Sequence, residues 1–440
     1  MAAIYIETYG CQMNEYDSEI VRALLAREHR FCGRLEDADV ALINTCAVRE
    51  SAHNKIHARV GDLTHERRSR GLVVGLLGCM AQNLKDELLS RGKVDFIAGP
   101  DSYRKLPGLV AAALKGGESP AAAVELSEYE TYADIVPERR EGVNAWIAVM
   151  RGCDNFCSFC VVPFTRGRER SRELKSVVAE ARACVAGGYR QVTLLGQNVN
   201  SYRDGAHDFA DLLEAVSAVP DLPRIRFTSP HPQDFPLRLL RVIAARPNLC
   251  KHVHLPLQAG NDAVLRRMNR GYTRAQYLDI ARAVRAEIPG VFLTTDIITG
   301  FPGETASEFA DTLAVMEELR FESAYIFKYS QRVGTLAARR YSDDVSDEEK
   351  SRRTVLLNDL QHRHTRAALE RQVGRSVEVL IEDERTPLSD GQCQGRMDQG
   401  VTVVLPQDGT LRRGELVKVE IRGCTSHVLL GEPARVPACV

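Results

Sequence analysis

The chain has 440 residues, which is too long for one ordinary hydrophobic core, so roughly two to four domains are expected. Its hydrophobic content of 44% and charged content of 27% are typical of a soluble globular protein, and a formal net charge of -1 excludes a global attraction to nucleic acid or anionic membrane. No apolar stretch approaches the ~20 residues of a membrane span, and the first residues do not form a targeting leader. Twelve cysteines without a leader indicate reduced thiols, so we expect a cytoplasmic protein.

The first part of the chain, up to about residue 118, alternates between apolar strand-like runs and helix-like segments. The strands are expected at AAIYIETYGC, DVALINTC and LVVGLLGC, and the helices at SEIVRALLAREH and at 48–70. Apolar runs that are each followed by a helix indicate a parallel sheet. We therefore predict an N-terminal parallel α/β domain over residues 1–118.

Three cysteines of this domain occupy the same topological position. Cys11, Cys46 and Cys79 each fall at the carboxyl end of a predicted strand, about one βα unit apart. In open α/β sheets the crevice beyond the strand carboxyl ends is the ligand site, so the three thiols are expected to converge there. An ordinary buried thiol is the alternative for each one alone.

A second domain begins after a charged, alanine-rich stretch at 115–142, which reads as a linker carrying a short strand or turn. Its strands are expected at AWIAVMRG, QVTLLGQ, RIRFTS, HVHLPLQ, FLTTDIITG and SAYIFKYS, with helical patterns between them. Six βα repeats predict an open (βα)6 barrel over 139–369, with its mouth at the strand carboxyl ends.

The run MRGCDNFCSFCVVPF follows the first strand of this barrel and carries Cys153, Cys157 and Cys160. The CxxxCxxC spacing gathers three thiolates on one loop, which suits a [4Fe-4S] cluster whose fourth iron stays open for another ligand. A zinc knuckle is the alternative. Zinc needs four closed ligands, and the nearest histidines, His65 and His207, are distant in the sequence, so the cluster is favoured.

The last part of the chain changes pattern again after a basic helix, SRRTVLLNDLQHRHTRAALERQVG. Short strands are expected at RSVEVLIEDE, CQGRMDQG, VTVVLP and ELVKVEIRGCTSHVLLGE. They predict a small all-β barrel of OB-like character over 371–435. Residues 371–440 hold 9 Lys and Arg against 10 Asp and Glu, so charge gives little support for RNA binding, although OB-like barrels do bind oligonucleotides.

Motifs from all three segments resemble the methylthiotransferase family of radical S-adenosylmethionine (SAM) enzymes, which joins an N-terminal cluster domain, a radical SAM core and a C-terminal TRAM domain. The motifs are TYGCQMNEYDSE, NTCAVRESA, GCMAQ, RGCDNFCSFCVVPFTRGRERSR, LLGQNVNSY, HLPLQAGNDAVLRRMNRGYTR and TDIITGFPGET. One departure is SQRVGT at 330–335, where the family more often has a proline before the glycine. The resemblance covers nearly the whole chain.

The resemblance implies two [4Fe-4S] clusters and SAM as cofactors. The radical SAM cluster would be held by Cys153, Cys157 and Cys160, and an auxiliary cluster by Cys11, Cys46 and Cys79. In this family one SAM methylates a sulfur on the auxiliary cluster, and a second supplies the radical that abstracts a hydrogen atom from a carbon without an acidic hydrogen. We also expect a monomer that receives electrons from a donor such as flavodoxin or ferredoxin.

Within the family, the residues after Cys11 resemble the branch that adds a methylthio group to C2 of N6-isopentenyladenosine at position 37, in the tRNA anticodon loop. Here Gln12, Met13 and Asn14 follow this cysteine. The branch acting on a ribosomal protein typically has Cys-Pro-Lys-Asn, and the threonylcarbamoyl-adenosine branch Cys-Lys-Val-Asn. Those two reactions are the alternatives, and a non-catalytic iron-sulfur RNA-binding protein is the alternative of another class.

Five residues are candidates for SAM contacts. Gly196, Gln197 and Asn198 close the second barrel strand, where related enzymes contact the SAM amino group; a simple strand-end turn is the alternative. Gly300 and Gly303 lack a Cβ and would allow close approach to the adenosine of SAM, or else form a tight turn.

Four arginines that follow the cluster loop at every second position are candidates for RNA phosphate contacts. They are Arg166, Arg168, Arg170 and Arg172. Solvated arginines at the start of a helix are the alternative.

Overall fold

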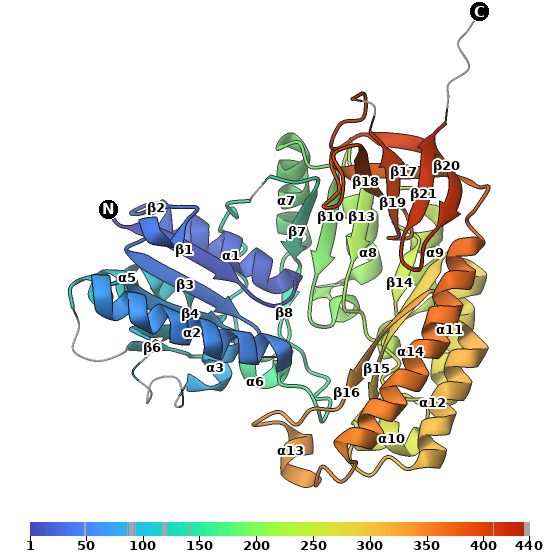
Figure 1. Ribbon diagram of the computed structural model, residues 1–440, viewed down its shortest axis with the longest axis horizontal. Helices are drawn as coiled ribbons and strands as arrows, with labels where there is room; N and C mark the ends of the chain where they lie inside the picture. The colour runs from blue at the N-terminus through green and yellow to red at the C-terminus, as the bar shows by residue number, and fades with distance from the viewer. Residues whose placement is uncertain are drawn as a thin grey trace, which may run out of the picture.

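The protein is described from a computed structural model that covers residues 1–47, 50–85, 87, 92, 94–116, 121–139, 141–407 and 409–434. Figure 1 shows an N-terminal α/β lobe beside a larger lobe of strands and helices, with a small β-barrel at one end of the larger lobe. The predicted fold class, with its three parts, is confirmed. Within the described part of the chain, no helix has both the length and the apolarity that a bilayer crossing requires.

The N-terminal lobe is built on one parallel sheet of order β2-β1-β3-β4-β5-β6. Its strands are β1 (Ala3–Thr8), β2 (Arg30–Phe31), β3 (Val40–Thr45), β4 (Val73–Gly78), β5 (Phe96–Ala98) and β6 (Ala121–Ala123). The helices are α1 (Gln12–Leu25), α2 (Glu50–Arg70), α3 (Cys79–Asn83) and α5 (Leu106–Leu114). Every residue of β3 and β4 is buried, as expected for central parallel strands covered on both faces.

The predicted linker is partly a piece of this lobe. Its β6 strand adds an edge to the parallel sheet, pairing with β5. Further along, the ring of Tyr132 is fully buried, and its hydroxyl accepts from the backbone N–H of Tyr103 and donates to the carbonyl of Pro100. The sequence of this segment has no periodic pattern of apolar residues, because single contacts such as those of Tyr132 hold it in place rather than one regular apolar face.

The central domain contains all six predicted barrel strands. They form two parallel sheets of order β13-β10-β7 and β14-β15-β16. The strands are β7 (Asn144–Ala148), β10 (Gln191–Leu195), β13 (Arg224–Phe227), β14 (His252–His254), β15 (Phe292–Thr299) and β16 (Ser323–Lys328). A parallel bridge between Ile225 and Leu249 links the two halves. The barrel is open, because within the described chain the outer strands β7 and β16 pair only with β10 and β15.

Helices cover the outside of this barrel, and several begin at capping boxes that satisfy their first backbone N–H groups. Asp208, Thr273 and Thr305 each cap a helix in this way. The helices are α6 (Val162–Arg166), α7 (Leu174–Ala186), α8 (Phe209–Ser217), α9 (Leu237–Ala245), α10 (Asp262–Arg267), α11 (Arg274–Glu287), α12 (Ala306–Leu319), α13 (Leu336–Arg340) and α14 (Asp347–Glu370). Two short strand pairs complete the domain: β8 (Met150–Arg151) with β9 (Arg170–Ser171), and β11 (Arg203–Asp204) with β12 (His207–Asp208).

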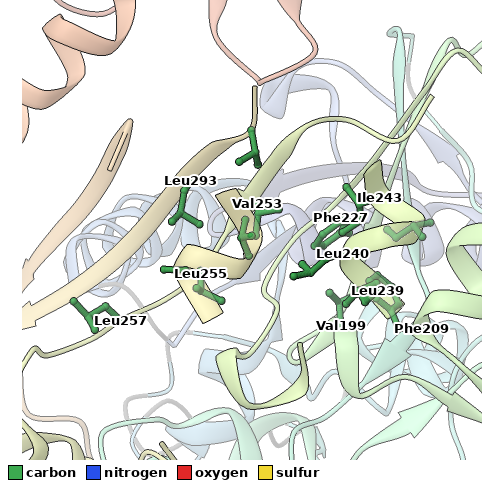
Figure 2. Packing of buried hydrophobic residues seen from close by; sticks show 14 of the residues in the cluster. Val199, Phe209, Phe227, Leu239, Leu240, Ile243, Val253, Leu255, Leu257 and Leu293 are labelled. Carbon is green, nitrogen blue, oxygen red and sulfur yellow. The ribbon is translucent and has the colours of Figure 1, made fainter. Parts of the chain in front are cut away.

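A single large apolar core fills the space between the barrel strands and these helices. Figure 2 shows part of it, with Phe209 of α8 and Leu239 of α9 beside Phe227 of β13. The rings of Phe209 and Phe227 meet edge to face, with centroids 5.4 Å apart. This packing gives the strand ends, where ligands bind in such sheets, a rigid base.

The C-terminal domain is a closed five-stranded barrel of order β17-β18-β19-β21-β20. Its strands are β17 (Ser376–Asp383), β18 (Gln392–Met397), β19 (Thr402–Pro406), β20 (Leu416–Cys424) and β21 (Leu429–Pro433). Leu369, near the end of α14, belongs to the barrel core. The Arg224 guanidinium donates to the backbone carbonyls of Glu378 and Arg396, which anchors the barrel to the central domain.

Candidate active site

The three N-terminal cysteines do meet at one edge of the sheet. Cys46 and Cys79 directly follow the last residues of β3 and β4, and Cys11 lies just beyond β1 as the N-cap of α1. The three strands are adjacent and parallel in the sheet, so their carboxyl ends lie together. The thiols of Cys11 and Cys46 are hydrogen-bonded to each other.

Two glycines allow this close approach. A Cβ on Gly10 would lie 2.6 Å from the Cβ of Cys46, and one on Gly78 would lie 2.5 Å from Oδ1 of Asn44. Both glycines also have positive φ, 143° and 90°, which L side chains rarely adopt. Any larger residue at either position would therefore push the cysteine loops apart.

A pair of buried asparagines ties the loops after β1 and β3 together. The Asn14 side-chain amide donates to Oδ1 of Asn44 at 3.1 Å and to the carbonyl of Thr45 at 3.0 Å, and the Asn44 amide donates to the carbonyl of Asn14 at 2.9 Å. The Cys11 thiol donates to Oδ1 of Asn14. Sequence reasoning used Asn14 only to choose a family branch and missed this role, which its position three residues after Cys11 signals.

The second cysteine set lies on the loop between β8 and α6. The β8–β9 pair closes the base of this loop through Met150 and Ser171. A Cβ on Gly152, just before Cys153, would lie 1.9 Å from the carbonyl oxygen of Arg168, so only glycine fits there. The Gly152 N–H donates to Oε1 of Gln197 at 2.6 Å, so Gln197 at the end of β10 positions the cluster loop.

The pKa values of the thiols are shifted in both directions. The hydrogen bond from Cys46, helped by the positive charge of Arg166, lowers the pKa of Cys11 to about 6 although the thiol is buried. Burial raises the pKa of Cys79, and Arg166 opposes that shift. Burial also raises the pKa values of Cys153 and Cys160, each to about 12.

The two sets adjoin each other. The side chain of Val161, next to Cys160, packs in one small buried cluster with Cys79 and Ala47. Helix α6, which follows the second cysteine loop, lies against α3, which begins at Cys79. The N-terminal core also continues across the boundary, because Ala148 of β7 and Leu195 of β10 belong to it. Anything bound at one set therefore lies near the other.

The donor chemistry of both sets suits iron-sulfur clusters. Among the described residues, no group of three His, Cys, Asp or Glu side chains lies close enough to hold a single metal ion. A four-iron cube is different, because each thiolate binds its own iron. One guanidinium nitrogen beside Cys79, Nη1 of Arg166, is buried and has no hydrogen-bond partner within the described structure, which leaves a donor for an electron-rich group.

Three of the four arginines predicted to contact RNA are buried instead. Arg166 pairs with Asp17, and Arg170 with Asp101, at 2.8 Å in both cases. Arg172 pairs with Glu180 at 2.5 Å. The phosphate role is therefore wrong for these three, and so is the alternative of solvated arginines. They form ion pairs inside the protein, two of them across the domain boundary.

Arg168 is the member of this arginine series that stays exposed, with two-thirds of its side chain accessible. It pairs with Asp154 and lies over the ring of Phe156 on the cluster loop. A phosphate contact by this arginine stays a prediction.

Three of the residues predicted to contact SAM directly follow β10, near the loop that carries the second cysteine set. Gly196 has no room for a side chain, because a Cβ would lie 2.8 Å from Met150, next to the cluster loop. The amide nitrogen of buried Asn198 donates to Glu169 and Asp234, while its oxygen has no partner among the described residues. That free oxygen, together with the Gln197 contact, is compatible with a ligand at this strand end.

Gly300 and Gly303 form a tight turn. Their φ angles are 72° and 73°, and a Cβ on Gly300 would lie 2.3 Å from the Lys350 side chain rather than against open space. This geometry favours a tight turn, which was the alternative to a SAM contact at these two glycines. A role in SAM binding stays a prediction.

The comparisons with known proteins agree with this geometry. Family models match the chain over 3–99 (Uncharacterized protein family UPF0004), 147–316 (Radical SAM superfamily) and 370–434 (TRAM domain). Proteins named tRNA-2-methylthio-N(6)-dimethylallyladenosine synthase, from Porphyromonas gingivalis and Prosthecochloris aestuarii, are 46% and 48% identical to this chain. The first alignment covers 99% of this chain and 95% of the relative, and the second 97% of each.

The chain belongs to the methylthiotransferase family of radical SAM enzymes. Membership in the radical SAM superfamily implies a [4Fe-4S] cluster and SAM as cofactors. Solved structures show the same fold at low identity. The methyltransferase TsrM from Kitasatospora setae has a TM-score of 0.59 at 15% identity, over 76% of this chain and 77% of that chain. The cobalamin-dependent enzyme OxsB has a TM-score of 0.53 at 12% identity, over 80% of this chain and 56% of that one.

Proposed function

We propose that this methylthiotransferase is a tRNA-2-methylthio-N6-dimethylallyladenosine synthase, which replaces the hydrogen on C2 of N6-isopentenyladenosine at position 37 with a methylthio group. The observation that carries the proposal is the meeting of two cysteine triads at one domain boundary. The near-full-length identity to relatives of that name supports the substrate.

We assign the radical SAM cluster to Cys153, Cys157 and Cys160, and an auxiliary cluster to Cys11, Cys46 and Cys79. When bound, the two clusters and SAM supply the radical and the sulfur that side chains cannot supply, because C2 of adenine has no acidic hydrogen. The chain itself contributes by holding the cluster ligands in place and by excluding water. Cys46, Cys79 and Cys153 are all nearly inaccessible to solvent, so chemistry between the two triads is shielded.

The residues around each triad orient its ligands. Gln197 holds the backbone of the radical loop at Gly152, and the Arg270 guanidinium donates to the Cys157 sulfur at 3.2 Å. On the auxiliary side, Asn14 and Asn44 fix the loops that carry Cys11 and Cys46. These contacts hold the thiolates in place before any substrate arrives, which is what a preorganised site requires.

The substrate must reach the boundary between the triads as an extruded base, because a stacked adenine cannot enter a buried site. We assign binding of the tRNA to phosphate contacts, with Arg168 as a candidate, and to the C-terminal barrel. Affinity should therefore fall as salt is added. We also expect the enzyme to act in the cytoplasm as a monomer that takes electrons from a flavodoxin or ferredoxin.

The decisive test compares tRNA nucleosides by mass spectrometry from a strain that lacks the gene, with and without this chain. Restoration of the 2-methylthio form of isopentenyladenosine supports the proposal. Restoration of the methylthio form of threonylcarbamoyl-adenosine, or no change in tRNA together with a methylthio group on a ribosomal protein, would contradict it.

A second experiment tests the role of the barrel in tRNA binding. Removing residues 371–440 should weaken tRNA binding while uncoupled SAM cleavage persists, since the triads lie upstream of the cut. Because Leu369 packs in the barrel core, the truncated chain also carries Leu369→Ser to keep it from aggregating, and the full chain with that change is the control. Unchanged tRNA affinity in the truncated chain would give the barrel a structural role only.

A further inference from the structure

Arg166 connects the two cysteine triads. It is the last residue of α6, the helix that begins two residues after Cys160 of the radical loop. Its side chain crosses the domain boundary and is 4% exposed. There its Nε donates to the sulfur of Cys79 at 3.1 Å, and its Nη2 donates to Asp17 at 2.8 Å. One short segment therefore contributes to both sites.

The charges around Arg166 do not balance within the described structure. Asp17 is fully buried and is shared by two guanidinium groups, because Arg151 also donates to it, at 2.6 Å. One carboxylate thus faces two fixed positive charges. In addition, Nη1 of Arg166 is buried without a hydrogen-bond partner. A buried charged donor is costly unless a partner satisfies it, so this arrangement fits an anionic, sulfur-rich group beside Cys79.

We propose that Arg166 is the positioning residue of the auxiliary cluster, with Nε bonded to the Cys79 thiolate and Nη1 available to a sulfur of the cluster. The proposal rests on the proposed function, which places a cluster at Cys11, Cys46 and Cys79. Hydrogen bonds to sulfur and nearby positive charge stabilise the reduced, more electron-rich state of such a cluster and raise its midpoint potential. Because α6 continues from the radical loop, Arg166 also ties that loop to the loop that carries Cys79.

The test is an anaerobic redox titration of the reconstituted, full-length enzyme, followed by electron paramagnetic resonance. The signal that SAM does not perturb reports the auxiliary cluster. In R166Q we expect the midpoint potential of this cluster to shift to a more negative value, or the iron content to fall from about eight to about four, each cluster being a four-iron cube. The radical cluster should keep its signal and its response to SAM.

The matched control is R170Q. Arg170 is also a buried arginine that pairs with an N-terminal carboxylate, Asp101, across the same boundary, but none of its hydrogen bonds goes to a cysteine within the described chain. It should leave the auxiliary potential unchanged. An R166Q enzyme with wild-type potential and full iron content overturns the proposal, as does an equal effect in R170Q.

R166K covers the case in which R166Q fails to fold. Lysine keeps the positive charge but lacks the planar fork of donors, so the auxiliary potential should shift in the same direction by a smaller amount. A wild-type potential in R166K contradicts the proposal. Failure of the proposed function has a different signature, namely a wild-type enzyme that holds only about four irons, one four-iron cube.

Discussion

The two cysteine triads are built by opposite routes. One is drawn from the ends of three parallel strands that are distant in sequence, and it depends on glycine and asparagine residues that let the loops touch. The other lies on one loop whose base is closed by a short strand pair. A site made from one loop needs only local order, whereas a site made from three strands exists only when the whole sheet is folded.

The surroundings of the triads differ as strongly as their construction. The auxiliary side is ionic, with Asp17 held between Arg151 and Arg166. On the radical side, Arg270 is also buried against a cysteine, yet its other partners are the Tyr272 hydroxyl and the carbonyl of Pro256, and it forms no ion pair within the described part of the chain. The difference implies that ion pairs contribute more to the stability of the auxiliary site, and local packing more to the stability of the radical site.

Loss of one radical-loop thiolate should have the largest effect. Cys157→Ala leaves two thiolates for the cube and removes the sulfur that accepts from Arg270. We expect reductive SAM cleavage to fall to background, because a cluster held by two thiolates keeps neither its occupancy nor its potential. The measurement is 5'-deoxyadenosine released from SAM with a strong reductant. Cys184→Ala, in a buried thiol on α7, is the control. Normal release of 5'-deoxyadenosine by Cys157→Ala would contradict the assignment of the radical SAM cluster to this loop.

Removal of the other triad should separate the two activities. In the Cys11→Ala, Cys46→Ala, Cys79→Ala variant, the iron content should fall from about eight to about four, because one four-iron cube is lost. SAM cleavage should continue, while methylthio transfer to tRNA should stop. Iron analysis and nucleoside mass spectrometry check both halves of this outcome. Full methylthiolation by the triple variant would mean that these cysteines are merely structural.

The ionic character of the auxiliary side predicts a large stability effect at Asp17. Asp17→Asn leaves two buried guanidinium groups without their shared carboxylate, and breaking a buried pair in this way costs about 3–5 kcal/mol of unfolding free energy. Urea denaturation followed by circular dichroism measures it. The control is Asp279→Asn, which removes an exposed pair with Arg282 and should cost about 0–1 kcal/mol. Equal effects of the two substitutions would show that the boundary is not held by charge.

The arrangement of the triads was largely predictable from sequence, for a topological reason. Parallel strands end at a common edge, so Cys11, Cys46 and Cys79 could be placed together once their strands were identified. The six barrel strands were likewise recognisable from their apolar runs. Family membership is confirmed by the comparisons, whereas the ligand roles of individual cysteines stay predictions.

The arginines show where sequence reasoning fails. The position of these arginines after the cluster loop suggested phosphate contacts, but their burial depends on which domain packs against them. Arg166, Arg170 and Arg172 turn out to be enclosed by acidic partners, and the one exposed member is Arg168. The signal that could have corrected the prediction is Asp17, a carboxylate on the buried face of α1, because such a charge requires a buried partner.

The smallest expected effect is on the pH dependence of stability, and it concerns His231, a buried residue on the radical side. Burial, together with the nearby charge of Arg270, lowers the pKa of His231 to about 2, so the folded protein keeps this ring neutral. An unfolded histidine binds a proton below about pH 6.5, so the unfolded state gains protons that the folded state does not, and stability falls as pH falls. Between pH 8 and pH 6 this one group should cost about 0.8 kcal/mol of unfolding free energy.

The variant His231→Asn tests this prediction with little change in local structure. His231 caps a short helix by accepting from the backbone N–H of Gln233, and asparagine is also a good cap but does not titrate. The difference in unfolding free energy between the two proteins, from urea denaturation at pH 8 and pH 6, should therefore shift in favour of the variant by about 0.8 kcal/mol at the lower pH. Identical pH dependence in both proteins would show that the ring takes up its proton in the folded protein at the same pH as in the unfolded chain. At pH 6 the radical side would then carry a second buried positive charge beside Arg270, and the contrast with the ion-paired auxiliary side would be smaller.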